Sequence, residues 1–515
     1  MAEDFSDAYL FNLRGNQRTA GELSRKEGGK VFGSGSRAAV SIFVGVKDPN
    51  KSEFDLHYRD IGDYLSAEEK LAIVDASTIE NVEWQLIVPN RHGDWLNQRS
   101  DEFATWPVLG TRSNELPVFS VFSGGLKTNR DSWVYRFSQR DLGIDVRNTI
   151  AFFNSIRSKD EIDSKYIKWS SKFDSLFAAR RKLTFDPLSV REVMYRPFNR
   201  QHCYFNPELN DRPGHLPTMF PTPQHSNIGI YIPAASSASR DFNAQITTYL
   251  PDLSLSGSGS GQFFPRFTWE PVEATDGGLF GEGASIREGE SSIYGLIGEV
   301  VAGYARKDNI TDEIKALYRD ALGADVTGDD IFHFVYGKLH DPNYRETYAA
   351  DLKKMLPHIE TPGTREEFDK FARAGKELMD LHVGYEDVEP YPLDITVKGD
   401  ETDPETWHVL KMKWARKKDP ETGKNVNDVT KLIYNKHVTI TGIPAEADEY
   451  MLGSRSALAW LIDRYQVKKD KASGIVNDPN DWADEVGNPH YIVDLIGKVT
   501  RVAMETNRIV RGLEE

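Results

Sequence analysis

A loop near the start of the chain combines glycines with basic side chains. Between Asn12 and Arg37 the sequence reads NLRGNQRTAGELSRKEGGKVFGSGSR, with six Lys or Arg residues and six glycines. Glycine lets a backbone approach a ligand closely, and a cluster of cations attracts a polyanion. The alternative is a solvated surface loop. No GxxxxGK[ST] occurs, so the loop does not predict nucleoside triphosphate binding, and Gly33-Ser34-Gly35 is no dinucleotide fingerprint.

Two later segments place polar and basic groups beside aromatic rings. Residues 123–135 read SGGLKTNRDSWVY, which suits a phosphate or another polar edge. Otherwise this segment is a turn before a strand, with Trp133 and Tyr135 in the core. Residues 191–205 read REVMYRPFNRQHCYF. Arginine, asparagine and glutamine are the side chains that read guanine and adenine edges, although an alternating strand with a polar outer face has the same pattern.

Several other chemistries lack the residues that they need. The single cysteine, Cys203, excludes a disulfide framework or a thiolate zinc site within the chain. The twelve histidines form no HxH or HExxH, and no GxSxG is present. Asp341-Pro342-Asn343 and Asp478-Pro479-Asn480 resemble turns rather than a catalytic [DN]PP[YF] motif. We therefore predict no catalytic residue and no metal site.

The charge distribution is uneven. The net charge of −16 argues against a nucleic-acid partner, but residues 11–47 hold seven Lys or Arg against two Asp or Glu. Residues 111–215 hold eighteen against twelve. Phosphate attraction is local, since salt screens it beyond roughly 10 Å, so an acidic body with two basic islands can bind DNA. Ordinary mixed surfaces are the alternative.

The termini and hydropathy bear on location. The first residues lack the basic start and apolar run of a signal peptide, and no stretch approaches 18 apolar residues. With one cysteine, these features predict a cytoplasmic protein.

The elements that must position these segments alternate along the chain. Strands are predicted over 8–12 and 40–46, on either side of the basic loop, and Ser66 to Glu69 forms a capping box. Residues 111–300 are predicted to be mixed, with a flexible glycine-serine loop over 251–264. Beyond residue 300 the pattern is mainly helical. The expected helices there lie between the Thr311 cap and the Gly323 stop, over 331–339, after the capping box of Thr364 and Glu367, and over about 454–467 and 490–513, with short strands and turns over 385–445.

Several segments together resemble the carboxy-terminal part of Type ISP restriction–modification enzymes. They are NLRGNQRTAGE with KEGGKVFGSGSR, GGLKTNRDSWVY, YRPFNRQHCYF, FHFVYGKLHDPNYRETYAADLKKMLPHI and ALAWLIDRYQVKKDKASGIVNDPNDW. No single motif is diagnostic, but their order and spacing are specific. In that family one polypeptide joins a nuclease, a helicase-like ATPase, an adenine methyltransferase and a target-recognition domain.

The resemblance implies an α/β and α+β multidomain protein. Residues 1–110 would be the last strands of a Rossmann-like methyltransferase domain, without its SAM-binding and catalytic motifs. Residues 111–300 would form the DNA-reading lobe of a mixed α+β target-recognition domain, and 301–515 its helical and mixed support lobe.

The resemblance also directs the choice of DNA-contacting residues. Phe32 would touch a base flipped out of the duplex, or else pack in a core. The candidates for DNA contact are Arg14, Arg18, Lys30, Arg37, Lys127, Asn129, Arg130, Arg191, Arg196, Asn199, Arg200 and Gln201.

The implied function is sequence-specific recognition of double-stranded DNA, within an enzyme that methylates adenine and cleaves unmethylated foreign DNA. This chain alone is predicted to be inactive and to bind no cofactor, while SAM, Mg²⁺ and ATP serve the complete enzyme. Its partners would be duplex DNA and the rest of that polypeptide, with no membrane. The alternative is a protein-interaction module from a diverged methyltransferase that acts in phage defence. A hydrolase of another class is disfavoured by the missing motifs.

Overall fold

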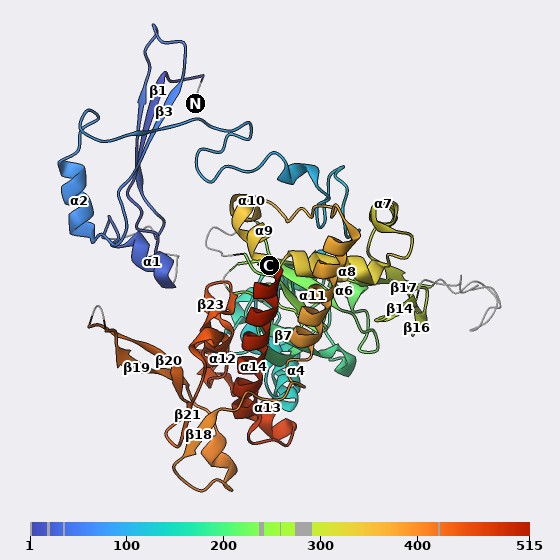
Figure 1. The fold of residues 1–515 in the computed structure, drawn as a ribbon. Coiled ribbons are helices and arrows are strands. Elements are labelled where there is room, and N and C mark those ends of the chain that lie inside the picture. Colours follow the sequence, from blue (N-terminus) through green and yellow to red (C-terminus); the bar gives the residue numbers. More distant parts are fainter. Residues whose placement is uncertain are drawn as a thin grey trace. The chain divides into compact units, whose positions relative to one another are not determined.

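The chain forms two compact units (Figure 1). The computed structural model describes residues 3–17, 21–33, 37–235, 242–257, 259–272, 291–420 and 423–514. Unit 1 contains the described residues up to Phe103, and unit 2 contains the described residues from Ala104 onward. No helix among the described residues is both long and apolar enough to cross a membrane.

Unit 1 is built on a mixed four-stranded sheet in the order β2-β1-β3-β4. Strand β1 runs parallel to β3 and antiparallel to β2, and β4 runs antiparallel to β3. Its strands and helices are β1 (Asp7–Asn12), α1 (Gly21–Glu27), β2 (Ser41–Val46), β3 (Asp55–Asp60), α2 (Ala67–Asp75) and β4 (Gln85–Ile87).

The local predictions for unit 1 are confirmed. Strands β1 and β2 occupy the two predicted ranges and pair with each other, so the basic loop joins adjacent strands. Ser66 accepts a hydrogen bond from the Glu69 amide, and the Glu69 carboxylate accepts one from the Ser66 amide, which completes the capping box of α2. However, every residue of the apolar strand β2 is exposed.

Unit 2 contains several small sheets rather than one large sheet. Two of them have four strands each, in the orders β11-β7-β8-β6 and β10-β9-β12-β5. Their strands are β5 (Ser123–Gly124), β6 (Tyr135–Arg136), β7 (Val190–Arg196), β8 (Asn199–Tyr204), β9 (Gly229–Pro233), β10 (Gln245–Thr247), β11 (Leu250–Pro251) and β12 (Gly261–Pro265). Another four-stranded sheet has the order β18-β21-β20-β19, from β18 (Asp394–Val397), β19 (Lys413–Lys418), β20 (Asn425–Ile433) and β21 (Val438–Thr441).

The remaining strands of unit 2 form small sheets and hairpins. Strands in the order β13-β17-β16 form a three-stranded sheet. Three further two-stranded sheets pair β14 with β15, β22 with β23, and β24 with β25. These strands are β13 (Phe267–Pro271), β14 (Ser291–Ser292), β15 (Gly295–Leu296), β16 (Val300–Val301), β17 (Tyr304–Asp308), β22 (Met451–Leu452), β23 (Arg455–Ser456), β24 (Lys468–Lys469) and β25 (Val476–Asn477).

The predicted change to helices after residue 300 is confirmed. Helix α7 begins after its Thr311 cap and ends at Gly323, and Thr364 caps α11 as predicted. The α-helices of unit 2 are α3 (Asp131–Val134), α4 (Gln139–Ser155), α5 (Ser171–Ala178), α6 (Leu216–Met219), α7 (Asp312–Leu322), α8 (Gly328–Lys338), α9 (Pro342–Thr347), α10 (Ala349–Lys354), α11 (Arg365–Val383), α12 (Ala457–Arg464), α13 (Asn480–Glu485) and α14 (Tyr491–Glu514).

A large hydrophobic core cluster joins several of the sheets and helices of unit 2. It runs from Leu126 to Ala503 and includes buried residues on both sides of position 300. Strands β13 and β17 also pair across that position. Residues 111–300 and 301–515, expected as two lobes of one domain, thus share a core. The coarse prediction of a mixed α+β protein is confirmed.

The predicted flexible loop over 251–264 is wrong at both of its ends. Strand β11 ends at Pro251 and β12 begins at Gly261, and both strands are buried. Between them the Asp252 carboxylate accepts a hydrogen bond from the Ser254 amide at 2.8 Å. The glycine and serine content hid this ordered turn, because the residues that bury it lie far away in the sequence.

Candidate nucleic-acid interface

The basic loop of unit 1 is held by a buried lysine. Lys70, on α2, is fully buried and donates from Nζ to the carbonyl oxygens of Glu27 at 2.6 Å and Gly29 at 2.9 Å. Burial lowers the pKa of Lys70. Gly28 and Gly29 lie so close to the backbone of residues 65–67 that a Cβ on either would clash with it. Residues 27–29 of the loop are therefore fixed against α2.

The predicted DNA-contact residues of this loop differ in exposure and in ion pairing. Arg14 is not free, since its guanidinium pairs with Asp60 at 2.7 Å and with Asp63. Lys30 is half-buried, Arg37 is exposed, and Arg18 lies outside the described residues. Phe32 is 59% exposed, so the alternative that it packs in a core is wrong. Its contact with a flipped base stays a prediction.

A cluster of two carboxylates and a histidine on β1 and β3 is paired with a lysine. Asp7, Asp55 and His57 lie close enough together to resemble a metal site. However, Lys51 Nζ lies 2.7 Å from the Asp7 carboxylate and 2.6 Å from that of Asp55. The Lys51 hydrogen bond lowers the pKa of Asp7 despite the opposing effect of desolvation. The lysine ammonium thus takes the place that a cation would need.

In unit 2, the segment 123–135 divides into buried and accessible residues. Arg130 is 1% exposed, pairs with Asp211 at 3.2 Å and donates to the Leu209 carbonyl. Burial lowers the pKa of Arg130. Trp133 is buried, as the core alternative predicts. Asn129 is exposed and donates to the Asp211 carboxylate, while Lys127 is half-exposed.

The segment 191–205 forms the hairpin β7–β8, with Arg196 opposite Asn199. Arg196 is 9% exposed and pairs at 2.6 Å with Asp252, whose other oxygen accepts from Tyr135 at 3.0 Å. Burial raises the pKa of Asp252, and the charge of Arg196 opposes that rise. This buried ion pair joins β7 to the turn after β11.

The other predicted hairpin residues also have internal partners. Arg191 donates to the Thr222 carbonyl, and Arg200 pairs with Glu192 and with Glu386 at 3.0 Å. Asn199 and Gln201 are buried and bonded to each other. The alternative of an alternating strand with polar side chains describes this hairpin better than a DNA-reading surface does. Buried or internally paired side chains are not accessible to a large ligand such as DNA.

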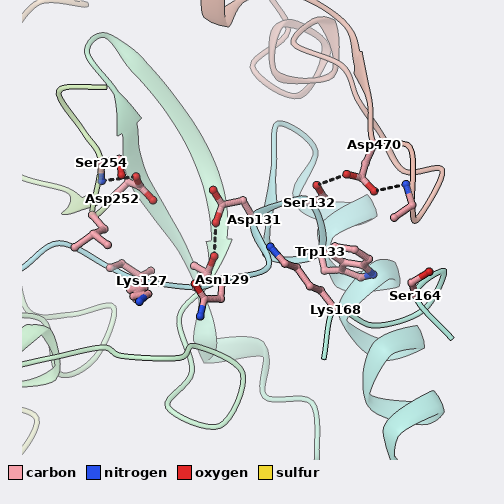
Figure 2. Close-up of a pocket in the computed structure, with 14 residues that line it drawn as sticks. Lys127, Asn129, Asp131, Ser132, Trp133, Ser164, Lys168, Asp252, Ser254 and Asp470 are labelled. Carbon is pink, nitrogen blue, oxygen red and sulfur yellow. Dashed lines mark hydrogen bonds between the residues drawn. The ribbon is translucent and has the colours of Figure 1, made fainter. Parts of the chain in front are cut away.

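A polar recess opens beside these segments (Figure 2). It has a volume of about 520 Å³ and is lined by residues from four separated stretches of the chain, 126–133, 164–168, 252–254 and 470–472. Figure 2 shows Asp252 and Ser254 on one side of the recess and Asp470 on the opposite side. The ammonium groups of its two lysines, Lys127 and Lys168, have no ion-pair or hydrogen-bond partner among the described residues.

The carboxylates of the recess are engaged, in contrast to its lysines. Asp252 pairs with Arg196, Asp131 accepts from Thr128 and Tyr195, and Asp470 accepts from Ser132 at 3.1 Å and caps its own turn. An incoming anion therefore meets available ammonium groups, one acid neutralised by Arg196, and two carboxylates, Asp131 and Asp470, that are hydrogen-bonded by neutral donors and keep their charge.

The hairpin β24–β25 forms one wall of the recess, and sequence analysis did not select it as a site. It is positioned by Arg136, which donates to the Val476 carbonyl at 2.6 Å, and by Asn477, which accepts from the Phe137 amide at 2.9 Å. Asn477 also donates to Gln201 at 3.1 Å. The hairpin carries the exposed Lys468, Lys469 and Lys471. The signal was the sequence VKKDKASG, three lysines beside a turn.

A second hollow of about 280 Å³ shares Asp131, Ser132 and Asp470 with the recess and reaches Arg464, Lys468 and Lys469. Together the two hollows form a continuous polar, lysine-bearing surface, which we call the recess surface. Its residues lie between positions 126 and 477. Such a surface can bind phosphate groups and present serine and asparagine side chains to polar edges.

Comparison with known proteins gives consistent matches. A family model described as the Type ISP C-terminal specificity domain matches residues 117–495, which include the whole recess surface. No curated protein matches the sequence.

Three solved structures match nearly the entire chain. A nuclease-deletion mutant of the Type ISP restriction-modification enzyme LlaGI, in complex with a DNA substrate mimic, is 34% identical with a TM-score of 0.78 and 99% of this chain covered. The ATP-dependent Type ISP enzyme LlaBIII bound to DNA is 29% identical with a TM-score of 0.82 and 100% covered. A DrdV–DNA complex is 27% identical with a TM-score of 0.78 and 99% covered. The present chain spans 37%, 32% and 48% of those three chains.

Proposed function

Because this chain belongs to the family of Type ISP C-terminal specificity domains, we propose that it recognises a target sequence in double-stranded DNA for a restriction–modification enzyme. The observation that carries this proposal is the recess surface, where the ammonium groups of Lys127 and Lys168 lack partners among the described residues. The similar LlaGI and LlaBIII structures contain a DNA mimic and DNA. The local positive charge explains how a chain of net charge −16 binds an anion.

In the proposed complex, lysines hold the backbone and shorter side chains face the bases. Lys127, Lys168, Lys469 and Lys471 would contact phosphates, which positions the duplex without reading it. Asn129, Ser132 and Ser254 lie at the same surface and offer donors and acceptors to base edges. Target choice would thus reside in the short polar side chains of the recess.

Unit 1 would be the end of an adenine methyltransferase domain, as the resemblance implies for residues 1–110. Its described residues do not fit SAM by themselves. At the carboxyl ends of the parallel strands β1 and β3, Asn12 donates to Tyr58 and Asp60, and Arg14 pairs with Asp60. These groups satisfy one another, so no catalytic step is assigned here. SAM, Mg²⁺ and ATP would be held by other parts of the complete enzyme, together with methylation and cleavage.

The proposal is tested by selecting bound duplexes from a random library and measuring their affinity by fluorescence anisotropy. We expect the wild-type chain to prefer a selected duplex over a scrambled one. Lys168→Gln with Lys469→Gln is expected to weaken binding by about eightfold for each phosphate contact at 0.1 M salt, because affinity varies as roughly the −0.9 power of salt per contact. Lys353→Gln, at an exposed position on α10, is the matched control.

Failure to enrich or prefer any duplex would overturn the recognition function. Equal loss in the Lys353 control would overturn the placement at the recess surface. The alternative, a protein-interaction module, is favoured by the exposed apolar strand β2. It predicts no duplex preference, together with an association that substitutions in β2 abolish.

A further inference from the structure

The strands β19 and β20 extend beyond their sheet as a two-stranded ribbon (Figure 1). Only residues 431–433 of β20 pair with β21, whereas residues 425–428 pair with β19 alone. None of the residues 413–418 or 425–431 is buried. A two-stranded ribbon is marginal in stability by itself, and the segments 415–418 and 425–428 contribute no residue to the core cluster. The ribbon therefore needs another explanation than packing.

The register divides the side chains of the ribbon between two different faces. Arg416 lies opposite Asn427, and Lys418 lies opposite Asn425. Because side chains alternate along a strand, these four residues share one face. We call it the donor face. All four side chains are exposed, and the Arg416 guanidinium donates to Asn427.

The opposite face has a different chemistry. It holds the cross-strand pairs of Ala415 with Asp428 and of Lys417 with Val426. Lys417 Nζ lies 3.3 Å from the Asp428 carboxylate, so its charge is compensated. Asp428 is the one acid in the paired segments 415–418 and 425–428. The donor face thus carries two positive charges and two amides without a carboxylate.

Protection of a sheet edge is the competing explanation, since lysines on edge strands discourage aggregation. Edge protection requires charge but no particular face, and either face of a solvated ribbon would serve. In this ribbon both uncompensated charges of the paired segments, Arg416 and Lys418, lie on the donor face. The two asparagines opposite them lie on the same face. Arginine, lysine and asparagine are among the side chains that hydrogen-bond phosphate oxygens.

We propose that the donor face, Arg416, Lys418, Asn425 and Asn427, binds the phosphate backbone of double-stranded DNA as a second contact, in addition to the recess surface. This inference rests on the proposed function. The ribbon adds affinity for any duplex, whereas target choice resides in the recess surface. Two cationic contacts correspond to a salt-dependence slope of about −1.8.

The test uses the full chain and a labelled 30-base-pair duplex of scrambled sequence, titrated at several salt concentrations. Arg416→Gln with Lys418→Gln is expected to lower the slope of affinity against salt by about 1.8 and to weaken binding by up to about 60-fold at 0.1 M salt. The same variant is expected to keep its preference ratio for a selected duplex. Lys417→Gln, one residue away on the opposite face, should change affinity less than twofold.

Three outcomes would overturn the inference, and they are distinguishable. Wild-type affinity in the double variant, with loss in the Lys168→Gln and Lys469→Gln chain, removes the ribbon and leaves the proposed function intact. An equal effect of Lys417→Gln shows a diffuse charge effect rather than a binding face. Absence of duplex binding by the wild type removes both proposals, and retained binding of an acidic peptide would then identify a protein partner. Unchanged thermal unfolding of each variant shows that the fold is intact.

Discussion

The two units differ in how completely each buries its own apolar side chains. Unit 2 has a large core cluster, in which rings such as Trp460 and Tyr434 are almost entirely buried. Unit 1 has two small clusters, one around Phe11 and Ile61 and the other around Leu56. Its strand β2 exposes four large apolar side chains, namely Ile42, Phe43, Val44 and Val46.

This difference leaves an exposed apolar edge strand on unit 1. An exposed apolar strand at a sheet edge is a template for pairing with other polypeptide. In the described part of unit 2, no strand exposes more than one large apolar side chain. Unit 1 therefore has the character of a domain that is completed by further protein, and the proposed methyltransferase core is a suitable partner.

The largest expected effect separates the stabilities of the two units. Trp460, on α12, is 2% exposed and donates from Nε1 to the Leu452 carbonyl at 2.9 Å. Trp460→Ala is expected to lower the free energy of unfolding of unit 2 by about 3–5 kcal/mol through the cavity it leaves. Hydrogen exchange by mass spectrometry reads both units in one experiment. Equal loss of protection in β1 and β3 would break the comparison, since it would show that the units unfold together.

Acidification is expected to destabilise unit 2 before unit 1. Burial lowers the pKa of His382 to about 3, and it also lowers the pKa values of His202, His333 and His340. A histidine with a lowered folded-state pKa contributes stability above its ordinary value of 6.5, and this stability is lost as the pH falls. The loss from His382 is about 1.4 kcal/mol per pH unit below that value.

Other groups modify this pH dependence without reversing it. Burial raises the pKa of Asp481 to about 6 and also raises the pKa values of Asp145, Asp252 and Asp448, so these carboxyls oppose the loss of stability in unit 2 as the pH falls. In unit 1, the lowered pKa of Asp7 matters only below 3.8. Urea unfolding at pH 7, 6 and 5 measures the effect, and His382→Gln should flatten it. Parallel destabilisation of both units between pH 7 and 5 would contradict the assignment to these histidines.

A smaller effect is expected from the lysine that fixes the basic loop of unit 1. Lys70→Met leaves the carbonyls of Glu27 and Gly29 without a donor, which costs about 1–3 kcal/mol. The matched variant, Lys30→Met, alters a half-buried lysine in the same loop and should stay within about 0.5 kcal/mol. Differential hydrogen exchange of the loop amides is the measurement. Equal effects of the two variants would mean that the anchor is not Lys70.

The smallest expected effect on stability is at the exposed strand. Val44→Lys should change the free energy of unfolding by less than about 0.5 kcal/mol, because Val44 is already exposed. It should nevertheless reduce concentration-dependent self-association of the chain in sedimentation velocity. Leu71→Lys, at an exposed apolar position on α2, controls for added charge. Unchanged association in the Val44 variant alone would show that β2 is not an adhesive edge.

The sequence by itself determined local structure and family. The caps at Ser66, Thr311 and Thr364 begin helices where they were predicted, because a cap needs only the side chain and the amides two or three residues later. The family was likewise recognised from the order of segments along the chain, without any knowledge of distant contacts. The family model and the solved structures confirm this family.

Only the tertiary structure decided which cations are available to a ligand. Arg130 and Arg196 resemble DNA contacts in the sequence, yet Asp211 and Asp252 neutralise them from 81 and 56 residues away. Lys168 has no distinguishing sequence context and Lys469 lies in a short lysine cluster, but only the fold shows that distant stretches of chain bring them to one surface. Burial and ion pairing are long-range properties, so the local types and spacing that predicted helices could not predict the site.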